Sequence, residues 1–94
     1  MYLKIHKTQF SEIVCICDED LIGKKFEDKD LQLDITERFY KGEKKTEDEI
    51  IKILKSATNI NIVGEKSINT ALKAGVISKE NIIKIKNIPH AQVY

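Results

Sequence analysis

The first third of the chain alternates apolar and polar residues with the two-residue period of β-strands. Residues 2–8 and 12–18 form two such runs, and the short segment between them predicts an antiparallel hairpin. Part of the second run, Ile13-Val14-Cys15-Ile16-Cys17, is apolar on both sides, which indicates a central strand of its sheet. Residues 31–35 alternate in the same way and predict a strand with one solvated face.

The apolar residues of the hairpin predict its register. A slip by one residue would turn every apolar side chain of a strand to the other face of the sheet. The register that puts apolar residues of both strands on one face pairs Thr8 with Glu12, Ile5 with Cys15 and Leu3 with Cys17. In this register His6 lies on the face opposite both cysteines.

The middle of the chain changes to the longer period of helices. Thr46-Glu47-Asp48-Glu49 is a capping box followed by an apolar stripe at helical spacing, so residues 47–56 are predicted to form a helix. A second helix follows Gly64 and ends at Gly75, which we expect to adopt the left-handed C-cap conformation. The segment 36–42 is too short to predict a helix.

The later apolar runs complete the predicted sheet. Residues 59–63 predict a buried strand, and residues 83–86 predict another with alternating lysines. Because proline is excluded from the centre of a strand, Pro89 predicts a kink and makes 91–94 an edge piece. Together these elements predict one α+β domain over residues 1–94, with a mixed or antiparallel sheet and two main helices packed on it.

Composition narrows the function classes. The chain has 94 residues, of which 33% are charged, and its net charge of +1 gives no overall attraction to nucleic acid, so any basic surface must be local. No apolar run approaches the ~18 residues of a membrane span, and no signal peptide pattern is present, so we expect a cytoplasmic protein without a membrane partner. The abundance of lysine and isoleucine suits a thermophile.

The candidate catalytic and metal-binding residues do not form a known pattern. Cys15, Cys17, His6 and His90 match no zinc-ligand spacing. A nucleophilic thiol needs an electropositive setting, whereas Cys17 precedes the acidic run Asp18-Glu19-Asp20. We therefore expect two buried apolar cysteines, no metal and no cofactor, and the balance favours a protein that is not an enzyme.

The strand-to-helix step at Gly64 is a candidate phosphate site, because helix N-termini attract anions. It has neither the spaced glycines of a dinucleotide loop nor the Gly-Lys-Ser/Thr ending of a triphosphate loop. Glu65 also stands where the anion would bind. Structural capping is the favoured interpretation.

Surface recognition is the function class that the sequence favours. Aromatic and imidazole rings mixed with lysine on a sheet face suit single-stranded RNA, since bases stack on rings and lysine binds phosphate. The expected RNA- or ligand-binding residues are Tyr2, Lys4, His6, Lys84, Lys86, His90 and Gln92. An ordinary lysine-rich solvated face explains the pattern about as well, and Arg38 is the sole arginine, which weakens the RNA interpretation.

Motifs spread over nearly the whole chain resemble a small archaeal family of unknown function, DUF424. The motifs are 4–8, Cys17-Asp18, 21–26, 39–42, 61–65 and 89–92. Their signature residues are Gly23, Phe39, Tyr40, Gly42, Gly64, Glu65, Pro89, His90 and Gln92. The resemblance implies an archaeal α+β protein without an assigned activity, loosely associated with translation and RNA handling, so it implies no catalytic residue.

Three functional hypotheses follow. The leading one is a non-catalytic module that associates with RNA or the ribosome. The second is a small enzyme or ligand-binding protein whose site forms where Gly64, Glu65, His6 and His90 meet. The third is a subunit whose exposed sheet edge pairs with another protein chain.

Overall fold

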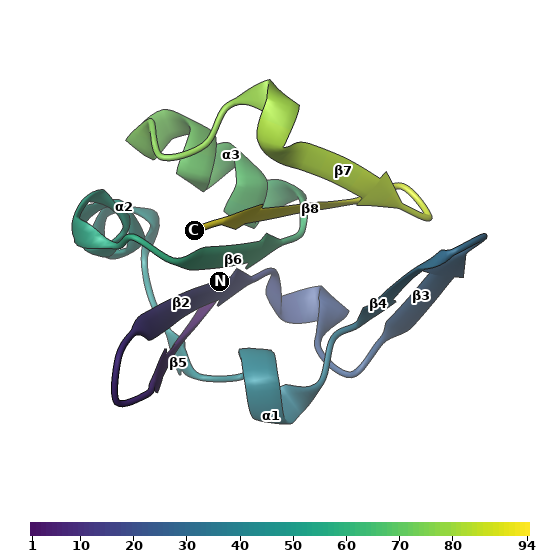
Figure 1. The fold of residues 1–94 in the computed structure, drawn as a ribbon, viewed down its shortest axis with the longest axis horizontal. Coiled ribbons are helices and arrows are strands. Elements are labelled where there is room, and N and C mark those ends of the chain that lie inside the picture. The colour runs from purple at the N-terminus through teal and green to yellow at the C-terminus, as the bar shows by residue number, and fades with distance from the viewer.

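In the computed structural model, which describes residues 1–94, helices cover one face of a mixed sheet, and a short helix and a hairpin cover part of the other (Figure 1). The strands are β1 (Tyr2–Lys7), β2 (Glu12–Cys17), β3 (Lys25–Asp28), β4 (Leu31–Asp34), β5 (Glu43–Lys44), β6 (Ile60–Val63), β7 (Ile82–Ile85) and β8 (Ile88–Val93). The helices are α1 (Glu37–Tyr40), α2 (Glu47–Ser56) and α3 (Glu65–Ala74), with 3₁₀ turns at Glu19–Leu21 and Lys79–Asn81.

The six-stranded sheet has the order β5-β1-β2-β6-β8-β7, and β3-β4 forms a separate hairpin. Strands β2 and β6 pair in parallel, while the other neighbours are antiparallel. The predicted α+β class, with a mixed sheet and two main helices packed on it, is confirmed.

Two apolar cores lie on opposite faces of this sheet. The first joins β1, β2, β6 and β8 to α2 and α3, and its largest fully buried side chains include Ile16, Ile50 and Leu54. The second lies under α1 and the β3-β4 hairpin, where Tyr40, Leu33 and Ile35 cover the cysteines. Strands β2 and β6 are therefore buried on both sides, as the continuous apolar run of β2 predicts.

The predicted register of the first hairpin is wrong by one residue. Leu3 pairs with Ile16 and Ile5 with Val14, and four residues connect Lys7 to Glu12. The apolar pattern could not select the register, because β2 is apolar on both faces and accepts either alignment. As a consequence the cysteines of β2 share a face with the even-numbered residues of β1, including His6, instead of lying opposite them.

Local capping signals produce the predicted helix ends. Thr46 Oγ1 accepts a hydrogen bond from Glu49 N at 3.2 Å, and Glu49 Oε1 accepts one from Thr46 N at 3.0 Å, so the capping box of α2 is complete. Gly75 adopts the left-handed conformation after α3, with φ of 75°. In the segment too short to predict, Thr36 Oγ1 accepts from Phe39 N at 3.1 Å and starts α1.

The predicted kink and edge piece at Pro89 are wrong, because β8 is a continuous interior strand between β6 and β7. Gly64 N donates to Pro89 O at 2.9 Å, at the point where β6 ends. The partner for a Pro89 N–H would be Gly64 O, which instead accepts from Ile68 N at 2.9 Å in the first turn of α3. The missing donor of Pro89 therefore leaves no acceptor unpaired.

Asp18, the residue after β2, caps helix α3. Its Oδ1 accepts from Ser67 N at 2.8 Å and from Ser67 Oγ at 2.7 Å, and its Oδ2 accepts from Lys66 N at 3.0 Å. Gly64 has φ of 106°, and a Cβ there would overlap the Asp18 carboxyl group, so only glycine leaves room for the cap. The anion position assigned to Glu65 is thus occupied by Asp18, and Glu65 is exposed.

We predict that Asp18→Ala lowers the free energy of unfolding by about 2–3 kcal/mol, because it leaves two backbone N–H groups and a buried hydroxyl without an acceptor. Asp18→Asn should lose less, since one side-chain oxygen still accepts. Urea unfolding followed by circular dichroism measures both. Asp20→Ala, an exposed acid two residues on, is the matched control and should change stability by less than ~0.5 kcal/mol. Equal losses at Asp18 and Asp20 would contradict the capping role.

Candidate functional site

The sheet face that α1 covers in part carries no acidic residue in any of its six strands. Residues that pair across strands share a face, so the registers define this surface, which we call the α1 face. Its strand residues are Tyr2, Lys4, His6, Ile13, Cys15, Cys17, Lys44, Asn61, Val63, Ile83, Ile85, Ile88, His90 and Gln92. A ligand with negative charge meets no strand carboxylate on this face.

His6 is fixed in place by α1. Its Nε2 lies 2.8 Å from Phe39 O, and because a carbonyl only accepts, Nε2 carries the proton of this hydrogen bond. The imidazole also stacks on the Phe39 ring, with centroids 4.5 Å apart and planes 17° from parallel. Phe39 in turn makes an edge contact with Tyr40, whose hydroxyl donates to Asn61 Oδ1 at 3.0 Å. This chain of contacts orients the imidazole of His6.

His90 occupies the opposite part of the α1 face. It lies in β8 between Val63 of β6 and Ile83 of β7. Its side chain is partly buried, and its Nδ1 is the one fully buried side-chain nitrogen or oxygen without a hydrogen-bond partner. Burial lowers the pKa of His90 below its ordinary value, because the charged imidazolium loses solvation.

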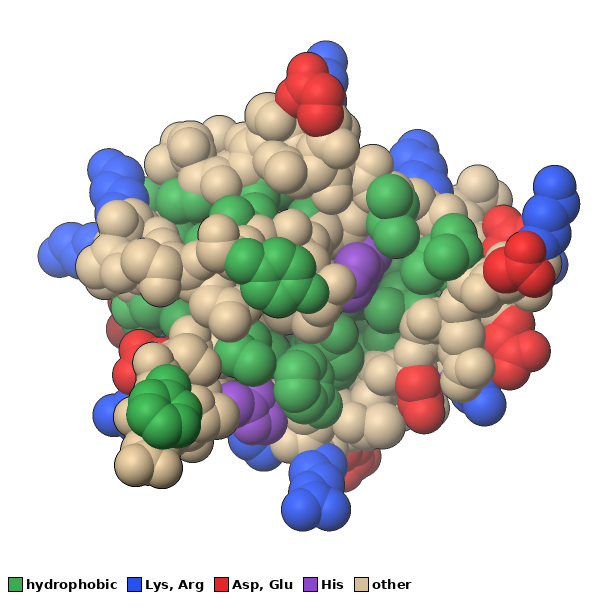
Figure 2. All heavy atoms as spheres, in the orientation of Figure 1, with side chains coloured by type: hydrophobic (Ala, Val, Ile, Leu, Met, Phe, Trp, Pro, Cys, Tyr) green, Lys and Arg blue, Asp and Glu red, His purple; other side chains and the backbone are tan.

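Exposed apolar and aromatic side chains border the two histidines. Figure 2 shows both histidines on one side of the molecule, with hydrophobic side chains between and around them and most charged groups towards the rim. Tyr94, directly after β8, is 86% exposed, and Phe10, in the β1-β2 loop, is 91% exposed. Ile83, the cross-strand neighbour of His90, is 46% exposed. Single exposed apolar groups are ordinary, but a set on one sheet face without strand carboxylates suits a ligand with flat apolar rings.

The structure places five of the seven residues predicted to bind RNA or a ligand on one face of the sheet. Tyr2, Lys4, His6, His90 and Gln92 all lie on the α1 face. Within this set Tyr2 has Lys44 Nζ 5.8 Å from its ring centroid, and Lys4 Nζ donates to Arg38 O.

The two late lysines lie elsewhere. Lys84 pairs with Pro89 and so lies on the opposite face from His90. Lys86 belongs to the β7-β8 turn, where it and Asn87 have φ of 50° and 67°. The predicted strand with alternating lysines over residues 83–86 is therefore correct for Lys84 but not for Lys86, because β7 ends at Ile85.

Gly64, Glu65, His6 and His90 do not meet. His6 pairs with Ile13 at the start of β2, whereas Gly64 follows the end of β6, the strand beside β2. His6 and His90 lie three strand spacings and about four residues apart, which corresponds to roughly 15–20 Å. The N-terminus of α3 is closed to an external anion because Asp18 binds its N–H groups.

A cavity beside the N-terminus of α3 is lined mainly by acidic residues. It has a volume of about 340 Å³ and is lined by Met1, Asp18, Glu19, Asp20 and Lys66. In the sequence Asp18 stands only as the first residue of the acidic run Asp18-Glu19-Asp20. Its position directly after a buried strand was the available signal, but only the parallel pairing of β2 with β6 shows which helix it reaches.

One comparison with known proteins shows the family of this chain. The model of the family described as "Protein of unknown function (DUF424)" matches residues 6–94. The chain belongs to the DUF424 family. Among solved structures, the crystal structure of an uncharacterized conserved protein from Methanopyrus kandleri matches with a TM-score of 0.87 and 30% identity, covering 99% of this chain and 89% of that one. No curated protein matches. None of the helices has the length and apolar character needed to cross a membrane.

Several DUF424 signature residues have structural explanations. A Cβ at Gly42 would overlap Leu3 O, so glycine lets the chain pass close to β1. Gly23 N donates to Ile35 O at 2.7 Å in the turn before β3. Tyr40 binds Asn61, and Pro89 accepts from Gly64 N. These contacts hold the DUF424 fold together. Two further signature residues lie on the α1 face: Gln92 is exposed, and His90 is partly buried with its Nδ1 unpaired, which makes them the better candidates for function.

The two cysteines of the DUF424 chain are buried and reduced, as predicted. Burial raises the pKa of Cys15 and of Cys17 to about 12, and for Cys17 the nearby Asp18 and Asp20 add to the shift. At neutral pH both are thiols, and Cys17 Sγ donates to Asp18 O at 3.3 Å. Neither has the exposed thiolate that a nucleophile needs.

We predict that neither thiol reacts with Ellman's reagent in the folded protein at neutral pH, because both are buried and protonated. Labelling should instead follow global unfolding and rise with urea at the same rate for both. A Ser11→Cys variant places a thiol in the exposed β1-β2 loop and is the positive control, expected to react at once. Rapid labelling of Cys15 or Cys17 without urea would contradict this packing.

We predict that His90 titrates below the ordinary histidine pKa of about 6.5, because burial disfavours its charged form. The unfolded chain then binds more protons than the folded one, so His90 reduces stability as the pH falls below about 6.5. Proton NMR of the imidazole measures the midpoint, and pH-dependent urea unfolding measures the stability. In His90→Gln this part of the pH dependence should disappear. A midpoint equal to that of the urea-unfolded chain would contradict the prediction.

Proposed function

We propose that this DUF424 protein is a non-catalytic module that binds single-stranded RNA, free or within the ribosome, through its α1 face. The single observation that carries the proposal is that this face combines exposed rings with an absence of strand carboxylates. RNA presents a phosphate backbone, which carboxylates repel, and unstacked bases, which rings and flat apolar groups bind.

The rings differ in how they would serve such a ligand. The imidazole of His6 is already stacked on Phe39 and held by a hydrogen bond, so it needs little further ordering to bind. Tyr94 is almost fully exposed and free to stack on both sides of its ring. Gln92, two residues before Tyr94, and His90 supply polar atoms on the same face, and polar edges of that kind read bases by hydrogen bonds.

Positive charge on this face is modest, and it comes from Lys4 and Lys44. With a net charge of +1, the proposal is one of moderate affinity with contributions from stacking, in contrast to a strongly basic RNA-binding surface. In the same proposal the protein acts in the cytoplasm of an archaeon, and its lysine- and isoleucine-rich composition suits a thermophile.

A small enzyme is the weaker alternative. The four residues that would have formed its site do not converge, and both thiols are buried. No specific contact favours a catalytic role, so we do not propose one.

We predict that Tyr94→Leu weakens binding to a single-stranded RNA about 5- to 100-fold, the range expected for loss of one stacked base. Tyr94→Phe keeps the ring and should bind like the original protein. Fluorescence anisotropy with a labelled oligonucleotide of mixed sequence gives both affinities, and affinity should decrease as salt increases.

The control for unspecific charge effects is Lys84→Glu, which alters an exposed lysine on the opposite sheet face and should have a smaller effect than Tyr94→Leu. Because Tyr94 and Lys84 are exposed, none of these variants should change the melting temperature appreciably. Absence of binding to RNA and to ribosomal subunits at low salt would overturn the proposal.

A further inference from the structure

Strand β1 has a free edge over its second half. On one side β1 pairs with β2 along its whole length, but on the other side β5 pairs only with Tyr2 and Leu3. Lys4, Ile5, His6 and Lys7 therefore have no strand beside them on that side. An exposed strand edge offers unpaired backbone groups that another extended chain can bind.

The backbone groups that face this edge belong to Ile5 and Lys7. Met1 O accepts from Lys45 N at 3.0 Å, so the odd-numbered residues of β1 direct their backbone groups towards β5. The other side of the sheet agrees, because Val14 N donates to Asn59 O at 2.9 Å and therefore points away from β1. Ile5 and Lys7 lie beyond the end of β5 and offer two N–H and two C=O groups.

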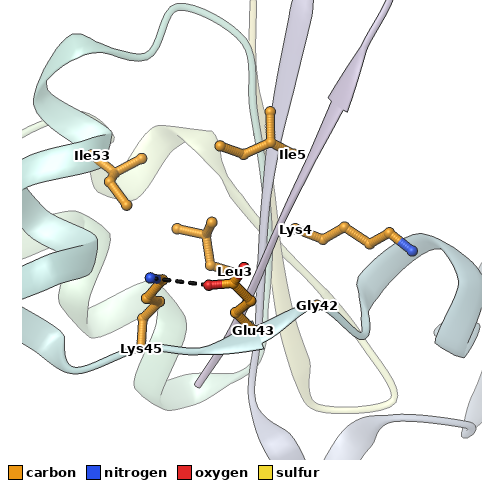
Figure 3. A pocket seen from close by; sticks show the side chains of 7 residues that line it. All are labelled: Leu3, Lys4, Ile5, Gly42, Glu43, Lys45 and Ile53. Atoms are coloured by element: carbon orange, nitrogen blue, oxygen red, sulfur yellow. Dashed lines mark ion pairs between the residues drawn. The ribbon is translucent and has the colours of Figure 1, made fainter.

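A cavity of about 400 Å³ lies next to this edge, on the face of the sheet covered by α2. Figure 3 shows Leu3 and Ile5 of β1 and Ile53 of α2 around it, while Lys4 extends away towards the other face. Ile5 is 38% exposed. At the rim Lys45 and Glu43 form an ion pair of 3.1 Å, so they bring no net charge to the cavity. The cavity suits an apolar side chain of an incoming strand.

The charges along the free edge indicate the charge of the strand that would bind there. This stretch contains two lysines and a histidine and no acid. Lys4 Nζ binds a carbonyl, so its charge has no carboxylate partner, and Lys7 is 3.9 Å from Glu12 with both side chains exposed. A second copy of the chain would add a second Lys4 and Lys7 and no acid to the short ladder, so it offers no complementary charge on either face. An acidic strand would complement them.

We propose that the free edge of β1 binds an extended, acidic segment of a partner protein by strand addition. In this arrangement the ladder forms with the backbone of Ile5 and Lys7. The acidic residues of the segment lie beside Lys4 and His6 on the α1 face, and the alternate apolar residues face Ile5 and the cavity. The segment thus has a strict alternation of acidic and apolar residues. This surface shares Lys4 and His6 with the RNA proposal. It does not depend on that proposal, because the ladder forms with the backbone groups of Ile5 and Lys7 at the strand edge.

The test uses a short fluorescent peptide in which glutamate alternates with valine, added to the full chain. We expect saturable binding by anisotropy, and slower hydrogen exchange at the amides of Ile5 and Lys7. A peptide of the same composition with its glutamates in one block should bind at least about fivefold more weakly, since alternation is lost. A peptide in which lysine replaces glutamate should bind more weakly still.

Backbone methylation separates strand addition from simple charge attraction. N-methyl groups on the peptide residues whose N–H faces β1 should weaken binding about fivefold or more, whereas N-methyl groups on the alternate residues should have much less effect. This experiment uses the unaltered protein. Equal effects of the two methylation patterns, or equal binding of the lysine peptide, would overturn the proposal.

A matched pair of proline variants tests the same point in the protein. Ile5→Pro removes an outward N–H and leaves the ladder with β2 intact. Lys84→Pro removes an outward N–H in the same way at the other sheet edge. Gly64 N donates to Pro89 O, so the odd-numbered residues of β8 direct their backbone groups towards β6 and the even-numbered ones towards β7. Their partners in β7 are odd-numbered, so the backbone groups of Lys84 point outward. Ile5→Pro should lose peptide binding and Lys84→Pro should retain it, with melting temperatures measured for both. Retained binding in a folded Ile5→Pro variant would overturn the proposal.

Discussion

The rest of the structure depends on the Asp18 carboxylate at the N-terminus of α3. A buried carboxylate is costly unless its oxygens are paired, and here it accepts from two backbone N–H groups and one hydroxyl at the positive end of a helix. The contact joins the end of β2 to the strand-helix junction after β6. These two strands form the one parallel pair of the sheet, so the same contact aligns the antiparallel hairpin at one side with β8 and β7 at the other.

This arrangement also decides where function can lie. The helix end that attracts anions in many proteins is closed by the protein's own carboxylate, and Gly64 gives that carboxylate its space. The thiols are sealed beneath α1 and the β3-β4 hairpin. What remains open is the part of the α1 face around His6 and His90, together with the edge of β1. The two proposals concern these surfaces, one with rings and no strand carboxylates and the other with unpaired backbone groups and lysines.

The sequence predicted correctly those features of the fold that depend on residues close together in the chain. The capping box of α2 and the left-handed Gly75 are local, because a side chain or a backbone angle within a few residues determines them, and both were predicted correctly. The register of the first hairpin was predicted wrongly because β2 is apolar on both faces. Among the candidate residues, the alternation of β1 and β8 placed Tyr2, Lys4 and His6, and His90 with Gln92, on single faces, and only the sheet order showed that these faces are the same.

The sequence by itself determined the α+β class, the helices at Glu47 and Glu65 and the burial of β2, since period and capping are local properties of the chain. The tertiary structure alone decided three points. Pro89 fits inside the sheet because β6 ends opposite it. The Gly64 oxygen that would pair with an N–H at this position accepts from Ile68 N instead. Lys84 faces away from His90 because the β7-β8 pairing sets its direction. Asp18 caps α3 across 49 residues of sequence, and no local pattern encodes a contact that forms only after two strands align.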